Sequence, residues 1–380
     1  MSTTAGKGTG YEALGLHPVI NACATLTKLG GSVMPPEVVQ AMTDAARCFV
    51  DLEELQRRVG ARIAELTHNE SAYVSSGAAA GMVLATAACT VGTDREAHAR
   101  VPRLDTVKNE IIVQSLHRNG YDYAVRQVGV TVVDVGGPHG TSREELEAAF
   151  TDRTAAVFWF QGAMNAPAEL PLERVIEAAG RRGIPVLVDA AAQLPPVENL
   201  WRFTRMGAAL AIFSGGKDLA GPQSSGLVLG RADLIEACRF HGNPNQSIGR
   251  PMKVGKEELM GALAAVERYV ALDHDGRMRG LEEVVARWVE RLASIEGVAA
   301  RRDFPNEAGQ PVPWALVTFA DEAIRDAIVD RLRSGSPSVA VAKAGSAAIH
   351  LNPMTLQPGE ADVVLERLLE EIGTSIPRCD

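Results

Sequence analysis

One lysine stands in a glycine-rich segment directly after an apolar run, where an amine is costly to bury. Lys217 lies in FSGGKDLAGPQSSGLVLG, residues 213–230, and follows the apolar run 208–213. A lysine in such a loop is either a solvated surface residue or a reactive amine, because desolvation lowers its pKa. The segment lacks the G-x-x-x-x-G-K-[ST] spacing of a nucleotide-binding phosphate loop. Taken alone, Lys217 fits either interpretation.

Two other apolar runs also end in residues suited to chemistry. Asp189 follows the run 186–188, and a buried carboxylate there needs a partner because an unpaired charge is costly. Residues 75–81, SSGAAAG, follow the short run 72–74. Small residues let backbone N–H groups approach an anion at a helix N-terminus, but they also permit close helix packing. A helix cap at Asp189 and plain packing at 75–81 remain alternatives.

The three features together favour one cofactor, pyridoxal 5'-phosphate (PLP). Its phosphate suits a helix N-terminus, and its pyridine nitrogen needs an aspartate that keeps the ring an electron sink. Its aldehyde needs a lysine for a Schiff base. The chain presents these partners in order as residues 75–81, Asp189 and Lys217. The carboxyl ends of parallel strands meet at one edge of a sheet, so the three are expected to share a site.

The segment around Lys217, SGGKDLAGPQSSGLVLGR, is similar to the lysine loop of fold-type I PLP enzymes. More narrowly, it resembles the group related to selenocysteine synthase (L-seryl-tRNA selenium transferase), which includes D-glucosaminate-6-phosphate ammonia-lyase-like proteins. The resemblance extends from about residue 10 to the C-terminus. The other segments that carry it are VINACATLTKLGGSVMPPEVVQAM, SSGAAAG, HRNGYDYAVRQVGV, VLVDAAAQLPP, GRPMKVGKEE and LNPMTLQPGE.

The resemblance implies roles at the matching positions. Lys217 would hold the cofactor and move the substrate's α-proton, Asp189 would pair with the pyridine nitrogen, and His117 would lie over the ring. A lone histidine more often packs in a core, so that alternative stays open for His117. No metal is implied. The residues implied to contact the cofactor are Ser76, Gly77, Ala78, His117, Asp189, Gln193, Ser214 and Lys217.

Basic residues are the candidates for binding an anionic substrate. Arg118, Arg250 and Lys253 are predicted to do so, and arginine binds a carboxylate best through two parallel hydrogen bonds. In this fold class the active site usually lies at a dimer interface. The turn 29–32 and the basic cluster 250–256 are therefore expected to reach a neighbouring subunit's site, with a solvated basic loop as the alternative. Lys343 stands where an arginine would be the stronger carboxylate partner.

The surrounding elements alternate between apolar runs and helical patterns, which predicts an α/β protein with a mainly parallel sheet. The resemblance implies the fold-type I architecture: a large domain with a seven-stranded sheet and a small C-terminal α+β domain. The small domain is expected to begin with one long helical stretch over 260–293. Strands are predicted at 72–74, 110–114, 131–135, 155–160, 185–189, 208–213 and 227–229. The predicted bounds are 1–45 for an N-terminal segment that contacts the active site or a partner subunit, 46–260 for the PLP-binding domain and 261–380 for the small domain.

Composition limits the classes of partner. The 380 residues carry a net charge of -9, which disfavours nucleic acid because its phosphates attract lysine and arginine. No run of 18 apolar residues predicts a membrane span. The five cysteines (23, 48, 89, 238 and 379) are scattered, which disfavours disulfides and zinc and predicts a cytoplasmic location. A homodimer or higher homo-oligomer with shared active sites is expected from the resemblance.

The resemblance implies an enzyme acting on a small amino acid or amino sugar acid through an external aldimine and a Cα carbanion. The predicted reaction is β-elimination of the ammonia-lyase type. A racemase, an aldolase, an aminotransferase and a β- or γ-replacement enzyme are alternatives. Selenium transfer to tRNA fits less well, because the VIN motif at Val19 leaves no room for a tRNA-binding region. A non-catalytic scaffold is disfavoured because Lys217 and Asp189 are both present.

Overall fold

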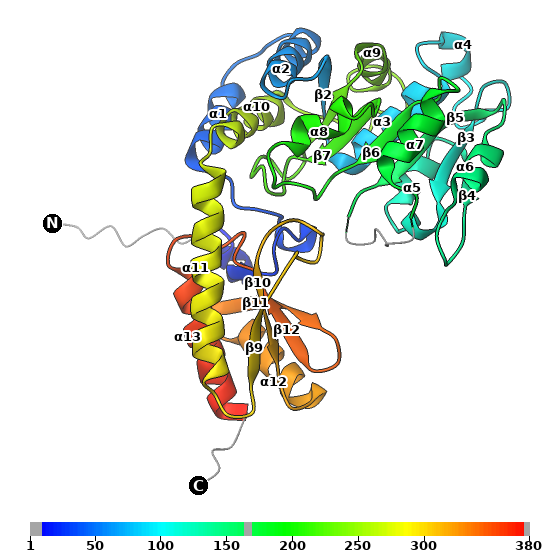
Figure 1. The fold of residues 1–380 in the computed structure, drawn as a ribbon. Coiled ribbons are helices and arrows are strands. Elements are labelled where there is room, and N and C mark those ends of the chain that lie inside the picture. Colours follow the sequence, from blue (N-terminus) through cyan, green and yellow to red (C-terminus); the bar gives the residue numbers. More distant parts are fainter. Residues whose placement is uncertain (1–9, 163–168, 376–380) are drawn as a thin grey trace. The chain divides into compact units, whose positions relative to one another are not determined.

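The computed structural model describes residues 10–162 and 169–375, which form two compact units (Figure 1). The larger unit contains residues 30–272 and 307–310, and the smaller contains residues 10–29, 273–306 and those from 311 onward. The predicted boundaries after residues 45 and 260 both fall inside the larger unit. The predicted segment 1–45 divides between the units: β1 (Val19–Ala22) belongs to the smaller and α1 (Pro36–Ala46) to the larger.

The larger unit is built on a seven-stranded sheet with the order β2-β8-β7-β6-β5-β3-β4. Strands β4, β3, β5, β6 and β7 pair in parallel, and β8 runs antiparallel to both β7 and β2. The predicted α/β class with a mainly parallel, seven-stranded sheet is confirmed. The strands are β2 (Ser71–Ser75), β3 (Glu110–Gln114), β4 (Thr131–Val135), β5 (Thr154–Phe160), β6 (Val186–Asp189), β7 (Leu210–Ser214) and β8 (Gly226–Gly230).

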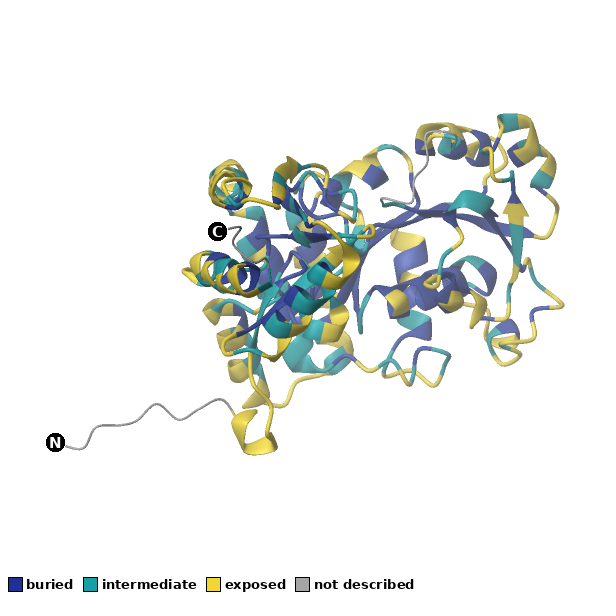
Figure 2. Ribbon diagram, turned by 90° about the horizontal axis from the view of Figure 1, so that it is seen from below, coloured by how far each residue is buried: buried dark blue, intermediate teal, exposed yellow. Residues whose placement is uncertain are grey.

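Helices cover both faces of this sheet, so its strands are largely buried (Figures 1 and 2). Within β6, Val186 and Val188 join one apolar core and Leu187 joins the other. Because successive side chains point to opposite faces, a strand covered on both sides needs an unbroken apolar run. The first core includes α2 (Leu52–Leu66), α7 (Leu172–Gly180), α8 (Asn199–Arg205) and α10 (Lys256–Val270). The second includes α3 (Ala78–Thr90), α5 (Asp122–Arg126) and α9 (Ala232–His241).

Local sequence signals set where helices begin. Asp51 caps α2 by accepting the Glu54 N–H at 2.9 Å. α6 (Arg143–Ala149) begins with a capping box in which Ser142 and Glu145 bond to each other's backbone N–H. The single helical stretch predicted over 260–293 is in fact two helices, α10 and α11 (His274–Ala293). They are separate because Asp273 starts a new helix by accepting the Gly276 N–H at 2.8 Å.

In its described residues, the smaller unit combines a five-stranded sheet, in the order β1-β11-β12-β10-β9, with three α-helices around an apolar core. β1 pairs in parallel with β11, and the other pairs are antiparallel. The strands besides β1 are β9 (Ala299–Asp303), β10 (Trp314–Thr318), β11 (Ser338–Ala344) and β12 (Ala348–Leu351); the helices are α11, α12 (Glu322–Ser334) and α13 (Glu360–Ser375). Across the described ranges of both units, none of the helices has the length and apolar character needed to span a membrane.

Candidate active site

Most of the predicted site residues lie at one edge of the larger sheet. Ser75 at the end of β2 and Ser214 at the end of β7 both pair with Gly226. Asp189 ends the neighbouring parallel strand β6, and His117 follows β3 in the short turn 115–117. Parallel strands present their carboxyl ends on the same side. The topology thus brings together the predicted residues Ser76, Gly77, Ala78, His117, Asp189, Ser214 and Lys217.

Lys217 and Asp189 act on each other electrostatically. Burial raises the pKa of Asp189, while the Ala191 N–H, donated to Oδ1 at 3.0 Å, and the charge of Lys217 oppose that shift. Burial also lowers the pKa of Lys217, and the charges of Asp189 and Glu307 oppose it. A lysine with a lowered pKa carries more of the neutral amine, which is the nucleophilic and basic form.

The loop that carries Lys217 is held from several sides. The Tyr269 hydroxyl of α10 donates to Asp218 Oδ2 at 2.6 Å, and Ser32 Oγ donates to the Gly216 carbonyl at 3.0 Å. The Gly215 N–H donates to the Ser225 carbonyl at 2.8 Å. Ser32 belongs to the turn expected to reach a neighbouring subunit, yet here it contacts its own chain's lysine loop. Neither Ser32 nor Tyr269 was tied to Lys217 by any spacing in the sequence.

The segment before α3 combines close packing with open space. Gly77 caps α3 at φ 115°, and a Cβ there would meet no heavy atom within 4 Å. A Cβ at Gly226 of β8, by contrast, would lie 2.5 Å from the Gly77 carbonyl carbon. A Cβ at Gly81 would lie 3.0 Å from Ile212 Cγ2. The small residues at Gly81 and Gly226 therefore serve close packing, and the open space at Gly77 lies beside the N-terminus of α3, where an anion would be favoured.

His117 is fully buried and contacts an aromatic ring and a carboxylate. Its ring meets Trp159 edge-on, with centroids 4.5 Å apart, and its Nε2 lies 2.7 Å from Glu169 Oε2. Burial lowers the pKa of His117, and the hydrogen bond and charge of Glu169 oppose the shift. Sequence reasoning missed Glu169, because no spacing rule connects it with a histidine so far away in the chain.

Gln193 is also placed near this edge. It follows the end of β6 and is buried, and its Nε2 donates to the Ala308 carbonyl at 2.9 Å. Ser214 is half-buried at the end of β7. Their predicted contacts, with the ring hydroxyl and the phosphate of the cofactor, remain predictions.

The predicted substrate-binding residues differ in how they are engaged. Arg118 forms ion pairs with Asp122 and Asp134, at 2.5 and 2.6 Å, so its charge is already balanced. Arg250 Nη1 donates to a neutral partner, Asn243 Oδ1, at 3.4 Å. Lys253 is exposed. In the smaller unit, Lys343 Nζ pairs with Asp326 at 2.7 Å.

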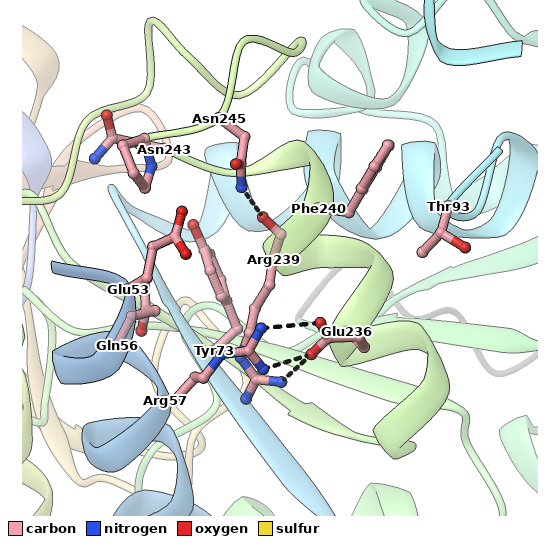
Figure 3. Close-up of a pocket in the computed structure, with 11 residues that line it drawn as sticks. Glu53, Gln56, Arg57, Tyr73, Thr93, Glu236, Arg239, Phe240, Asn243 and Asn245 are labelled. Carbon is pink, nitrogen blue, oxygen red and sulfur yellow. Dashed lines mark hydrogen bonds and ion pairs between the residues drawn. The ribbon is translucent and has the colours of Figure 1, made fainter. Parts of the chain in front are cut away.

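A polar cavity of about 210 Å³ lies elsewhere in the larger unit, between α2, α9 and the segment 243–245 (Figure 3). Arg57 donates to both carboxylate oxygens of Glu236 at 3.1 and 3.2 Å, and Arg239 donates to Glu236 at 3.0 Å. None of the predicted site residues lines this cavity. Within residues 10–162 and 169–375, no group of three or more His, Cys, Asp or Glu side chains is placed to hold a metal ion.

The model of the aminotransferase class-V family matches residues 34–249, which is more than half of the chain and includes the whole sheet edge described above. The chain belongs to the aminotransferase class-V family. Its cofactor is PLP, and the residues present fit this group. A lysine of lowered pKa, a buried aspartate and an accessible helix N-terminus are the partners that the aldehyde, the pyridine nitrogen and the phosphate require.

The relatives of this class-V chain include several enzymes. It is 37% identical over 378 residues to a 5'-C-glycyluridine monooxygenase-decarboxylase from Streptomyces, covering 96% of this chain and 92% of the relative. It is 31% identical over 371 residues to D-glucosaminate-6-phosphate ammonia lyase from Salmonella typhimurium, covering 95% and 97%. An L-seryl-tRNA(Sec) selenium transferase from Moorella thermoacetica is 25% identical over 410 residues, covering 95% and 83%.

A solved structure of D-glucosaminate-6-phosphate ammonia-lyase superposes with a TM-score of 0.84 at 30% identity, covering 97% of this chain and 99% of that one. The resemblance to fold-type I PLP enzymes and to the selenocysteine synthase-related group is thereby confirmed, as are the cofactor and the enzymatic nature of the class-V chain.

Proposed function

We propose that this class-V enzyme is a lyase that releases ammonia from a small amino acid or an amino sugar acid. The observation that carries the proposal is the electrostatic interaction of Lys217, whose pKa burial lowers, with the buried Asp189 at one sheet edge. It is supported by the 31% identity, over nearly the whole of both chains, to D-glucosaminate-6-phosphate ammonia lyase.

The roles follow from the positions of the side chains. When bound, PLP supplies an electron sink for a bond broken at the substrate's Cα. Lys217 Nζ takes up the α-proton, since its lowered pKa favours the neutral amine that a base needs. Asp189 holds the pyridine nitrogen in its protonated form. The backbone of residues 76–78, at the N-terminus of α3, holds the phosphate together with Ser214.

The net reaction balances without an oxidant. A β-hydroxy amino acid loses its α-proton and its β-hydroxyl as water; water then replaces the amine, which leaves as ammonia. The product is a 2-oxo acid. Arg250 and Lys253 form no ion pair with any residue that the structure describes, and they are proposed to bind the substrate's anionic groups. Arg118 is less suited, because Asp122 and Asp134 already engage it.

The test is a substrate panel under strictly anaerobic conditions. It contains amino acids with and without β-leaving groups and amino sugar acids with and without a phosphate. We expect ammonia and a 2-oxo acid in equal amounts, only from members with a β-leaving group and only with PLP bound. Lys217→Ala serves as the control. Product formation by that variant at the wild-type rate would overturn the proposal.

A second candidate is oxidative decarboxylation, favoured by the 37% identity to the monooxygenase-decarboxylase. In that case O2 is the oxidant: one oxygen atom enters the product at the former Cα, which becomes an amide carbon, the other leaves as water, and the substrate carboxylate leaves as CO2. The same panel repeated in air, with an oxygen electrode and CO2 detection, separates the two. Turnover that stops without O2 and releases CO2 selects this reaction, whereas turnover of equal rate with and without O2 selects the lyase.

The proposal also covers the oligomeric state and the cellular location of the enzyme. We infer a homo-oligomer in which Arg250 and Lys253 of one subunit serve a site whose Lys217 comes from another, in the cytoplasm. The location is supported by the lack of a disulfide at Cys23, Cys48, Cys89 and Cys238 within the part of the chain that the structure describes. Cys379 lies outside the described residues.

A further inference from the structure

His117 makes a hydrogen bond that the proposed function does not use. Its side chain is fully buried, and its Nε2 lies 2.7 Å from Glu169 Oε2. The Glu169 side chain is itself only 15% exposed. A carboxylate this well covered, and aimed at a buried imidazole, resembles the arrangement by which proteins orient a histidine for work at its other ring nitrogen.

Both ends of this hydrogen bond are anchored to β3. Gln114, its last residue, donates from Nε2 to the Leu170 carbonyl at 3.1 Å and accepts the Leu170 N–H on Oε1 at 2.9 Å. This pair of hydrogen bonds holds the backbone next to Glu169. The turn 115–117 then places His117 only three residues after Gln114. The two partners are 52 residues apart in the chain but share one support.

The plane of the imidazole is fixed separately. Trp159 of β5 meets it edge-on at an interplanar angle of 88°, and Trp159 Nε1 donates to Gln161 Oε1 at 2.9 Å. Trp159 packs against the ring and Glu169 lies within hydrogen-bond distance of its Nε2, so contacts with two separate segments restrict the orientation of the imidazole. A core histidine with only a packing role needs no carboxylate to achieve this.

An ionised carboxylate accepts hydrogen bonds and cannot donate them. A neutral His117 facing Glu169 must therefore carry its proton on Nε2, which makes Nδ1 the basic nitrogen. We propose that Glu169 is a positioning residue that fixes the Nε2–H tautomer and the orientation of His117 against the PLP ring. This inference rests on the proposed function for the cofactor contact, but its tautomer part concerns the protein alone.

The sign of the pH effect follows from the charges around the ring. Burial lowers the pKa of His117, and Glu169 raises it; Trp159, the neighbour on β5, is uncharged. Removing the negative charge of Glu169 takes away a contribution that raises the pKa. In Glu169→Gln, His117 must therefore take up its second proton at a lower pH than in the wild type.

The first test is nitrogen NMR of the cofactor-free protein with 15N-labelled histidine, assigned with His117→Gln. We compare wild type, Glu169→Gln and the control Glu173→Gln. Glu173 lies on α7 and is exposed, so the control removes the same charge without touching His117. We expect the Nε2–H form in wild type and control. In Glu169→Gln, whose amide both donates and accepts, we expect a substantial Nδ1–H population and a midpoint shifted to lower pH.

The second test measures PLP affinity by fluorescence titration of the same proteins. Loss of a hydrogen bond to a charged group corresponds to about a tenfold weaker binding, which we expect for Glu169→Gln alone. An unchanged tautomer and midpoint in Glu169→Gln would overturn the proposal. A changed tautomer with wild-type PLP affinity would overturn its cofactor part.

Separate controls cover misfolding of the Glu169→Gln variant and failure of the proposed function. Should Glu169→Gln fail to fold, Gln114→Ala, which keeps the carboxylate but frees the backbone of residue 170, must shift the same signals in the same direction. Because the NMR readout needs no substrate, failure of the lyase assay leaves the test of Glu169 decisive. Conversely, an active lyase with an unmoved His117 signal disproves only the role of Glu169.

Discussion

At the scale of single residues, the proposed activity depends on the amine of Lys217. Replacing Lys217 with alanine removes the amine, and with it the positive charge that opposes the rise in the Asp189 pKa caused by burial. We expect turnover to fall at least ~10³-fold, because both cofactor attachment and proton transfer are lost. The yellow absorption band of lysine-bound PLP should vanish, and borohydride should no longer fix PLP to the 213–230 peptide. Lys108→Ala, at an exposed lysine, should keep both; a yellow band in Lys217→Ala contradicts the assignment.

Asp189 offers a test that keeps the shape of the site. Asparagine fills the same space but carries no charge, so PLP should still bind while turnover drops by about 10²–10⁴. The charge of Asp189 raises the pKa of Lys217, so its removal must lower that pKa further. Acetylation of Lys217 in the cofactor-free protein, followed by mass spectrometry against pH, should show a lower midpoint in Asp189→Asn. An unmoved midpoint would mean that the two groups do not interact.

Side-chain pairs were the part of the site that the sequence did not reveal. The placement of Lys217 and Asp189 at the sheet edge was predictable because each charge follows an apolar run, whereas their roles stay predictions. Glu169, by contrast, meets His117 across 52 residues, and Tyr269 meets Asp218 across 51. Such contacts depend on which strands and helices become neighbours, and composition and periodicity carry no information on that.

At the scale of elements, positions were predictable and pairings were not. The runs 110–114 and 131–135 coincide with β3 and β4. In β3, residues 111–114 are buried, as expected of an apolar run in a covered strand. β4 lies at the end of the strand order, and its Thr131 and Asp134 are exposed. The antiparallel direction of β8 is set by its pairing with β7 and β2. The division of 260–293 depends on one cap, Asp273, inside an otherwise continuous helical pattern.

The turn 30–32 and the lysine loop should act as one element. A Cβ at Gly31 would lie 2.3 Å from the Gly216 carbonyl, whereas one at Gly30 would meet nothing within 4 Å. Both glycines have positive φ, at 76° and 89°, so each alanine costs about 1–2 kcal/mol for backbone strain. Gly31→Ala should in addition displace the loop of Lys217. We expect urea unfolding to show a larger loss for Gly31→Ala and only that variant to lose PLP affinity; equal PLP affinities would separate the turn from the site.

The whole molecule sets which partners are plausible. The match to the ammonia-lyase structure covers 97% of the chain, so both units belong to the shared fold. A net charge of -9 disfavours the long-range attraction that brings tRNA to a protein, which argues for a small-molecule substrate. This expectation needs only the composition of the chain, and it stays a prediction. The bounds of the two units depend on a pairing that composition does not reveal, because β1, residues 19–22, pairs with β11 far away in the chain.

Sharing of sites between subunits can be tested by complementation. Lys217→Ala and the double variant Arg250→Ala with Lys253→Ala should each be inactive alone. If the amine and the basic residues of one site come from different subunits, each mixed dimer contains one site with both wild-type partners. Random pairing of the two variants then restores about one quarter of the wild-type sites in the mixture, and the isolated mixed dimer should have about one half. If each site is built from a single chain, mixing restores nothing. Co-expression with two affinity tags, isolation of the mixed dimer and measurement of ammonia release distinguish these outcomes, and a mixed dimer of Lys217→Ala with itself sets the background.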